Sequence, residues 1–366
     1  MVDKESQLLD RKILSFIEIY REAPASDSEF EALAFEIFDY QFRRNSYYRK
    51  FCLLEKKTPE NVRSWKEIPA MPTLTFKELT LASFPVKKRV CVFRTSGTTQ
   101  EIKGAHFFDT LRLYEHSLLP TFKKYLLPDH AKLSYYFVVS SWKDKPRSSL
   151  SYMIEIVNRH LALRHGKYYI KKGVAQLDRL VLDLKKEKNA VILLATSLAL
   201  KGFLDFLKGK NIKLHLAAGS RLMETGGYKG RTNEISKKVL YKLCDTYLGI
   251  PKTHCVSEYG MTELASQTYD TTLFDFVNHQ ERKPVKAGPA WLRTLVIDPR
   301  TGKESKKGQI GLLRHLDLAN RPSVMAVQTE DLGRATGDGF ELLGRAKSSP
   351  LRGCSLSYEE LIKKRL

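Results

Sequence analysis

The chain has 366 residues, 42% of them hydrophobic, which is enough for a large core in one big domain or in two to three packed subdomains. Its formal net charge of +21 favours anionic partners such as nucleotides and phosphates, but no nucleic-acid-binding motif accompanies the scattered basic runs. The composition excludes a disordered protein. A nucleic-acid binder is supported only by the net charge.

Targeting and metal signals are missing from the sequence. The N-terminus is charged and lacks the apolar run of a signal peptide, and no apolar stretch is long enough to span a bilayer. The five cysteines form no C-x-x-C pair, and the nine histidines show no metal-ligand spacing. We therefore expect a cytoplasmic protein without a transmembrane segment.

The first part of the chain reads as helical. Apolar residues recur at helical spacing over residues 30–42 and predict one buried helix face. Prolines at positions 69, 72 and 85 interrupt this texture and mark a connecting region. A short strand is predicted at residues 90–93, and it runs directly into a loop rich in serine, threonine and glycine.

The middle of the chain alternates between strands and helices. Apolar runs predict buried strands at residues 135–139, 190–195 and 212–217, and helical patterns lie at residues 197–207 and 233–248. This alternation predicts the α/β class, with a sheet and crossover helices.

The texture changes after Pro284. Residues 291–298 and 309–316 flank a turn at residues 299–302 and predict a hairpin. We expect a smaller β-rich subdomain here.

The loop after the first predicted strand has the composition of a phosphate-binding loop. Backbone N–H and side-chain O–H groups around a glycine can converge on phosphate oxygens, and a lysine adds a point charge. The pattern is not a Walker motif, and an ordinary turn is the alternative. The candidate phosphate ligands are Thr95, Ser96, Gly97, Thr98, Thr99 and Lys103.

A second motif, at residues 258–263, combines an aromatic ring with a carboxylate. The ring of Tyr259, beside Gly260, can lie against a purine, and Glu263 can hold Mg²⁺ together with nucleotide phosphates. The alternative is a strand-to-helix turn with an acidic residue at the start of the helix.

Two further motifs follow near the end of the chain. Asp331 lies in a polar segment where a carboxylate can accept hydrogen bonds from both ribose hydroxyls, although a simple β-turn would look similar. Cys354 is flanked by Arg352 and small residues, so it is either a reactive thiolate or an inert cysteine in a packed tail.

The order of these motifs resembles the adenylate-forming superfamily of acyl-CoA synthetases, peptide-synthetase adenylation domains and luciferases, over residues 90–360. The resemblance implies a large domain of stacked α/β sheet subdomains with a small β-rich subdomain, and ATP and Mg²⁺ as cofactors. It also implies that Ala218, Gly219 and Ser220 run along the adenine.

The resemblance further assigns roles around the nucleotide. Tyr259 with Gly260 would stack on adenine, and Thr262 would contact the α-phosphate. Glu263 would hold Mg²⁺. Asp331 would bind the ribose hydroxyls, and Arg345 matches the hinge arginine near the ribose.

A narrower match is carried by residues 41–52, 225–230, 329–333 and 352–356, which resemble the acyl-protein synthetase (LuxE) family. This family belongs to the fatty acid reductase complex that makes aldehyde for bacterial luminescence. The resemblance implies a fatty acid substrate and an acyl-AMP intermediate. It also implies a thioester on Cys354 and an acyl-CoA reductase-type protein partner.

The chain departs from the superfamily pattern at Gln100 and Ile102, and it stops soon after the hinge motif. We expect a large domain over residues 1–343, helical to about residue 85, and a short tail over residues 344–366. The superfamily's mobile C-terminal domain, with its adenylation lysine, would be truncated. Lys103, Lys347 or Arg352, or a partner, could then neutralise the charge at the α-phosphate.

The sequence thus predicts a ligase that activates a long-chain fatty acid with ATP and passes the acyl group to Cys354. One alternative is an aryl- or acyl-CoA ligase similar to phenylacetate-CoA ligases, in which CoA is the nucleophile and Cys354 is dispensable. Another is a non-catalytic nucleotide-binding scaffold. Release of pyrophosphate separates the enzymes from the scaffold.

Overall fold

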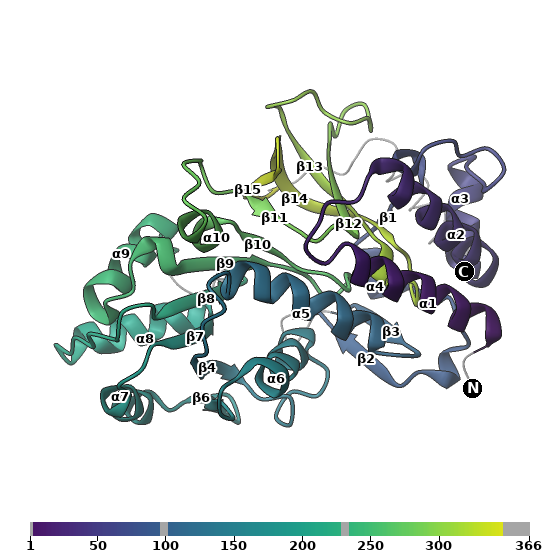
Figure 1. Ribbon diagram of the computed structural model, residues 1–366. Helices are drawn as coiled ribbons and strands as arrows, with labels where there is room; N and C mark the ends of the chain where they lie inside the picture. Colours follow the sequence, from purple (N-terminus) through teal and green to yellow (C-terminus); the bar gives the residue numbers. More distant parts are fainter. Residues whose placement is uncertain (1–2, 96–101, 228–233, 347–366) are drawn as a thin grey trace. The chain divides into compact units, whose positions relative to one another are not determined.

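The computed structural model describes residues 3–95, 102–227 and 234–346, which fall into two compact units (Figure 1). Unit 1 contains the described residues up to 121, residues 261–267 and the chain from residue 285 onward. Unit 2 contains the described residues between 122 and 260, together with residues 268–284.

The first part of unit 1 is largely helical, as predicted. Ser26 caps the second helix in a capping box with Glu29, and the predicted apolar face of this helix is buried. The elements are α1 (Lys4–Ile19), α2 (Asp27–Arg44), α3 (Ser46–Leu54), η1 (Trp65–Glu67), β1 (Met71–Pro72), α4 (Thr75–Glu78), η2 (Val86–Lys88), β2 (Cys91–Arg94), β3 (Ala105–Phe108) and the start of α5 (Arg112–Leu126).

The second part of unit 1 is β-rich, which confirms the change of texture after Pro284. The predicted hairpin is present as an antiparallel pair of strands, β12 and β13. The sheet order is β12-β13-β14-β15-β11, and β1 pairs in parallel with the start of β14, while β2 and β3 form a separate hairpin. The elements are β11 (Lys286–Ala287), β12 (Leu292–Ile297), β13 (Ile310–Asp317), η4 (Leu318–Asn320), β14 (Ala326–Thr336) and β15 (Gly339–Arg345).

A buried ion triad connects distant segments of unit 1. The guanidinium of Arg321, which has no exposed surface, contacts the carboxylate of Asp10 at 2.8 Å and 2.9 Å. Its third nitrogen lies 2.8 Å from the carboxylate of Asp109. Removing either aspartate would leave the buried guanidinium of Arg321 without one of its two carboxylate partners, which is strongly destabilising.

Unit 2 is an α/β sheet with crossover helices, as predicted. Strands β9, β8, β7, β4 and β5 run parallel in that order, β10 pairs antiparallel with β9, and β6 pairs antiparallel with β5. The central strand β7 is an apolar run buried on both faces, as parallel strands require, and α8 packs against it. The elements are β4 (Ser134–Ser140), α6 (Ser149–Leu161), β5 (Lys167–Lys171), β6 (Val174–Ala175), α7 (Leu177–Lys186), β7 (Val191–Thr196), α8 (Ser197–Gly209), β8 (Arg221–Thr225), α9 (Lys237–Leu248), η3 (Lys252–His254), β9 (Cys255–Tyr259), β10 (Thr268–Asp270) and α10 (Thr272–Val277).

One predicted strand is wrong. Residues 212–217 form no strand, and the strand that pairs with β7 is β8, at residues 221–225. The N–H groups of Leu214 and Leu216 donate instead to the carbonyls of Tyr247 and Leu248, at the end of α9. Their apolar side chains thus pack in a connecting segment, which a periodicity pattern does not distinguish from a buried strand.

Candidate functional site

The predicted phosphate loop is closed at its base by two backbone contacts in unit 1. The N–H of Thr95 donates to the carbonyl of Gly104 at 3.0 Å, and the N–H of Gly104 donates to the Thr95 hydroxyl at 2.8 Å. Lys103 is exposed beside this closure. The other candidate ligands, Ser96, Gly97, Thr98 and Thr99, lie outside the described residues.

The segment that carries Thr262 and Glu263 is fixed by buried side chains of the same unit. The Nδ1 atom of His106 lies 2.7 Å from the Thr262 carbonyl. Burial lowers the pKa of His106 to about 4, so a neutral ring donates from Nδ1. The side-chain amide of Asn320 donates to the Glu263 carbonyl at 2.8 Å.

Asp317 completes this cradle, which we define as His106, Asn320 and Asp317. Its carboxylate is fully buried and accepts from the N–H groups of Ala265 and Ser266 at 2.9 Å and 2.8 Å, and from the Ser266 hydroxyl at 2.7 Å. Burial raises the pKa of Asp317 to about 6 although these hydrogen bonds lower it. Three fully buried polar side chains thus set the path of residues 262–266.

None of the cradle residues was among the predicted site residues, since none belongs to a recognised motif. A signal was nevertheless present. Polar residues interrupt an otherwise apolar strand end at residues 315–321, and a buried polar residue requires a specific partner.

The carboxylate of Glu263 lies among the other predicted nucleotide ligands of unit 1. Burial raises its pKa to about 7, while the positive charges of Arg345 and Lys77 lower it and the negative charge of Asp331 raises it. Asp331 and Arg345 are paired across β14 and β15, and Arg345 contacts Glu330 at 2.7 Å. The structure therefore brings Glu263, Asp331 and Arg345 together.

This arrangement fits a magnesium ion that also binds substrate phosphates. Mg²⁺ is usually held by one or two carboxylates plus phosphates rather than by a full protein cage. The described residues contain no group of three or more His, Cys, Asp or Glu side chains that could hold a metal ion. A single buried carboxylate with a raised pKa has the chemistry of such a partial site.

In unit 2, Tyr259 is the last residue of β9, and Gly260 follows it. The neighbouring strand β8 ends beside them, because Thr225 and Glu258 are register partners and the Thr225 hydroxyl donates to the Glu258 carboxylate. The hydroxyl of Ser197 donates to the carbonyl of Gly226 at 2.8 Å. Residues 225–227 and Tyr259 thus share one edge of the parallel sheet, where ligands of such sheets bind.

The segment predicted to line the adenine lies elsewhere. Residues 218–220 precede β8 at its amino end, where the hydroxyl of Ser220 accepts from the N–H of Val191 at 3.1 Å and Gly219 adopts a left-handed turn. The five residues of β8 lie between this segment and the carboxyl end of β8, which is the end beside Tyr259. The structure therefore does not bring Ala218, Gly219 and Ser220 together with Tyr259, because strand direction places them at the opposite edge.

Comparison with known proteins identifies the family of this chain. Residues 133–363 match the family described as acyl-protein synthetase, LuxE. The chain belongs to this family. This chain is 22% identical over 354 residues to the long-chain-fatty-acid–luciferin-component ligase of Aliivibrio fischeri. The match covers 92% of this chain and 89% of the relative. It is 20% identical over 350 residues to the ligase of the same name from Vibrio harveyi. This second match covers 88% of this chain and 85% of the relative. The chain is therefore an enzyme, a ligase that activates a carboxylic acid.

Solved structures show the fold. A 2-hydroxyisobutyryl-CoA ligase in complex with its acyl-AMP and CoA superimposes with a TM-score of 0.63 at 14% identity, covering 90% of this chain and 78% of the ligase. ATP-bound MatB from Rhodopseudomonas palustris gives a TM-score of 0.50 at 15% identity, over 72% of this chain and 49% of that protein. The chain thus shares the mixed α/β fold of these solved structures, which confirms the predicted fold class.

The cysteines of the described residues offer no activated thiol. Cys52, Cys244 and Cys255 are buried, and Cys91 is partly buried, where burial raises the pKa of its thiol to about 11. Cys354 lies outside the described residues.

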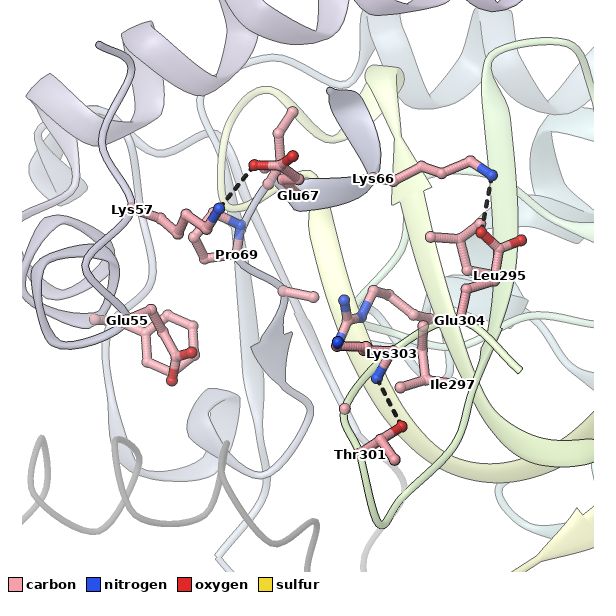
Figure 2. Close-up of a pocket in the computed structure, with 15 residues that line it drawn as sticks. Glu55, Lys57, Lys66, Glu67, Pro69, Leu295, Ile297, Thr301, Lys303 and Glu304 are labelled. Atoms are coloured by element: carbon pink, nitrogen blue, oxygen red, sulfur yellow. Dashed lines mark hydrogen bonds and ion pairs between the residues drawn. The ribbon is translucent and has the colours of Figure 1, made fainter. Parts of the chain in front are cut away.

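Figure 2 shows a separate cavity of about 540 Å³ in unit 1. Four of its charged residues form two pairs, with Lys57 against Glu67 at 2.7 Å and Lys66 against Glu304 at 2.8 Å. No predicted nucleotide ligand lines it.

Among the described residues, no helix is both long enough and apolar enough to cross a membrane.

Proposed function

We propose that this acyl-protein synthetase uses ATP and Mg²⁺ to convert a long-chain fatty acid to its acyl-AMP and then transfers the acyl group to Cys354. The main support is the convergence of Glu263, Asp331 and Arg345 next to a backbone segment fixed by buried side chains. The long-chain acid is suggested by the names of the two luciferin-component ligases, which share most of their length with this chain.

In the first step a carboxylate oxygen of the fatty acid attacks the α-phosphorus of ATP. The new oxygen–phosphorus bond forms as the bond to the β-phosphate oxygen breaks, and pyrophosphate leaves. The hydroxyl of Thr262 would donate to the α-phosphate, and the carboxylate of Asp331 would accept from the ribose hydroxyls. A bound Mg²⁺, held by Glu263, would offset phosphate charge.

The adenine would lie at the edge formed by Tyr259 and residues 225–227, with the ring of Tyr259 against the base. We place the adenine-lining segment at residues 225–227 in place of residues 218–220, because only the former follow the carboxyl end of a parallel strand. Gly226 supports this assignment, since it lacks a side chain and its backbone has a φ of +73°.

In the second step the thiolate of Cys354 attacks the acyl carbon, AMP leaves, and a thioester forms. An acyl-CoA reductase-type partner would then take the acyl group from this thioester, as in a fatty acid reductase complex.

The test is incubation of the protein with radiolabelled tetradecanoic acid, ATP and Mg²⁺, followed by a denaturing gel. Wild type and Cys91→Ser should carry label that hydroxylamine removes, and Cys354→Ser should carry none while still releasing pyrophosphate. Cys91→Ser is the matched control because the Cys91 thiol is partly buried and has a raised pKa.

Release of pyrophosphate without protein labelling in wild type would instead favour a ligase with an external acceptor. Addition of CoA would then yield acyl-CoA. If the protein releases no pyrophosphate with any fatty acid, even with a reductase present, the proposed function is wrong.

A further inference from the structure

Lys77 is an exposed cation close to the proposed site. It lies on the single-turn helix α4, and its side chain is exposed. Within the described part of the chain, no hydrogen bond or ion pair engages its ammonium group.

The backbone before α4 is anchored to the strand that carries Asp331. Met71 and Pro72 pair in parallel with Val327 and Gln328 of β14, and the N–H of Thr73 donates to the Gln328 carbonyl at 3.0 Å. The position of α4 is thereby fixed relative to β14.

On its other side, α4 packs against the base of the phosphate loop. A Cβ atom placed on Gly104 would stand 3.4 Å from the carbonyl carbon and oxygen of Phe76, the residue before Lys77. The Phe76 ring also meets the ring of His106 edge-on, with 6.0 Å between centroids. Phe76 therefore contacts both the loop base and the cradle residue that fixes Thr262.

The charge of Lys77 also acts on Glu263. Lys77 and Arg345 both lie close enough to the Glu263 carboxylate for their positive charges to act on it. Lys77 thus lies within electrostatic range of Glu263 and next to the residue that supports the phosphate loop, and all of these residues belong to unit 1.

We propose that Lys77 binds the ATP phosphates during acyl-AMP formation and offsets the charge that develops at the α-phosphate. This inference rests on the proposed function. The ammonium donates hydrogen bonds to phosphate oxygens and keeps its protons throughout, so its contribution is electrostatic. It would supply from α4 the positive charge for which the sequence had offered Lys103, Lys347, Arg352 or a partner.

The test compares Lys77→Met, Lys77→Arg and the control Lys87→Met, which alters an exposed lysine of η2 in the same unit. Binding of Mg·ATP, AMP and adenosine is measured by calorimetry, and fatty-acid-dependent ATP–pyrophosphate exchange is measured in parallel. Thermal unfolding shows whether each variant is folded.

Lys77→Met should weaken ATP binding by roughly 10- to 100-fold, the loss typical for a hydrogen bond between charged groups, and should leave adenosine binding unchanged. Its exchange rate constant should fall without a change in the KM for fatty acid. Lys77→Arg should recover part of both, and Lys87→Met should match wild type.

The proposal is overturned if Lys77→Met binds ATP as tightly as Lys87→Met, or if it weakens ATP and adenosine equally, as a structural role would. Absence of exchange in wild type would contradict the proposed function, yet the binding comparison would still decide the role of Lys77.

Discussion

The two units position their proposed nucleotide ligands by different means. In unit 2 the backbone ladder does the positioning, because the parallel register of β8 and β9 alone sets Thr225 opposite Glu258 and brings residues 225–227 beside Tyr259. In unit 1 the segment around Thr262 and Glu263 has no ladder, and the buried side chains of His106, Asn320 and Asp317 fix its path. A site segment outside a sheet thus depends on a few specific side chains, and single substitutions there should cost more.

The largest effect is expected from Asp317→Ala. This change leaves three buried N–H groups and the Ser266 hydroxyl without their acceptor, which should reduce the free energy of unfolding by on the order of 3 kcal/mol. Urea denaturation measures this loss, with Asp245→Ala, at an exposed carboxylate, as control. Equal unfolding midpoints for the two variants would show that the cradle does not stabilise the fold.

Glu263→Gln should separate stability from activity. Because burial raises the pKa of Glu263 from 4.5 to about 7, the stability that this group contributes is present below pH 4.5 and is lost as the pH rises through 7. The glutamine variant should therefore be more stable than wild type at pH 8, by at most about 3 kcal/mol at 1.36 kcal/mol per pKa unit. Denaturation at pH 5 and pH 8 measures this difference.

The same substitution should remove metal-dependent activation. In wild type, the affinity for Mg·ATP should rise as the pH increases through 7, since Mg²⁺ requires the ionised carboxylate. Titration of Mg²⁺ at several pH values checks this, and an unchanged pH dependence in Glu263→Gln would exclude Glu263 as the metal ligand.

A smaller contrast is expected between the two ends of β8. Gly226→Ala places a Cβ on a backbone with a φ of +73°, at a strain of about 1 kcal/mol, and should raise the KM for ATP several-fold. Ser220→Ala removes the acceptor of the Val191 N–H, so it should reduce stability by about 1 kcal/mol and leave the KM for ATP unchanged. A raised KM for ATP in Ser220→Ala, with an unchanged KM in Gly226→Ala, would instead indicate that residues 218–220 line the adenine.

The smallest effect concerns pH. Because burial keeps His106 neutral, with a pKa of about 4, its ring should not titrate between pH 5 and pH 8. His106→Gln, which retains an N–H donor, should lower the pyrophosphate-exchange rate only a few-fold and leave the pH profile unchanged. A pH–rate profile of both proteins tests this, and a lost inflection near pH 6 would contradict the neutral ring.

Much of the fold followed from the sequence, because apolar periodicity and strand–helix alternation reflect burial directly. The α2 face, β4, β7, α8 and the β12–β13 hairpin are all where the pattern placed them. The strand expected at residues 212–217 failed because the same apolar composition serves a segment that bonds to α9. The site motifs were recognisable as local runs. The cradle was not, because its side chains come from residues 106, 317 and 320 and meet only in three dimensions.

The ion triad of Arg321 has a consequence for the order in which the protein is made. Asp10 is synthesised about three hundred residues before the guanidinium that pairs with it. In the sequence, unit 1 has segments both before and after those of unit 2. On the ribosome, the described segments of unit 2 are nearly all available before Arg321 emerges. Unit 2 can therefore fold first, while Asp10 on helix α1 acquires its buried ionic partner only when almost the whole chain has been translated.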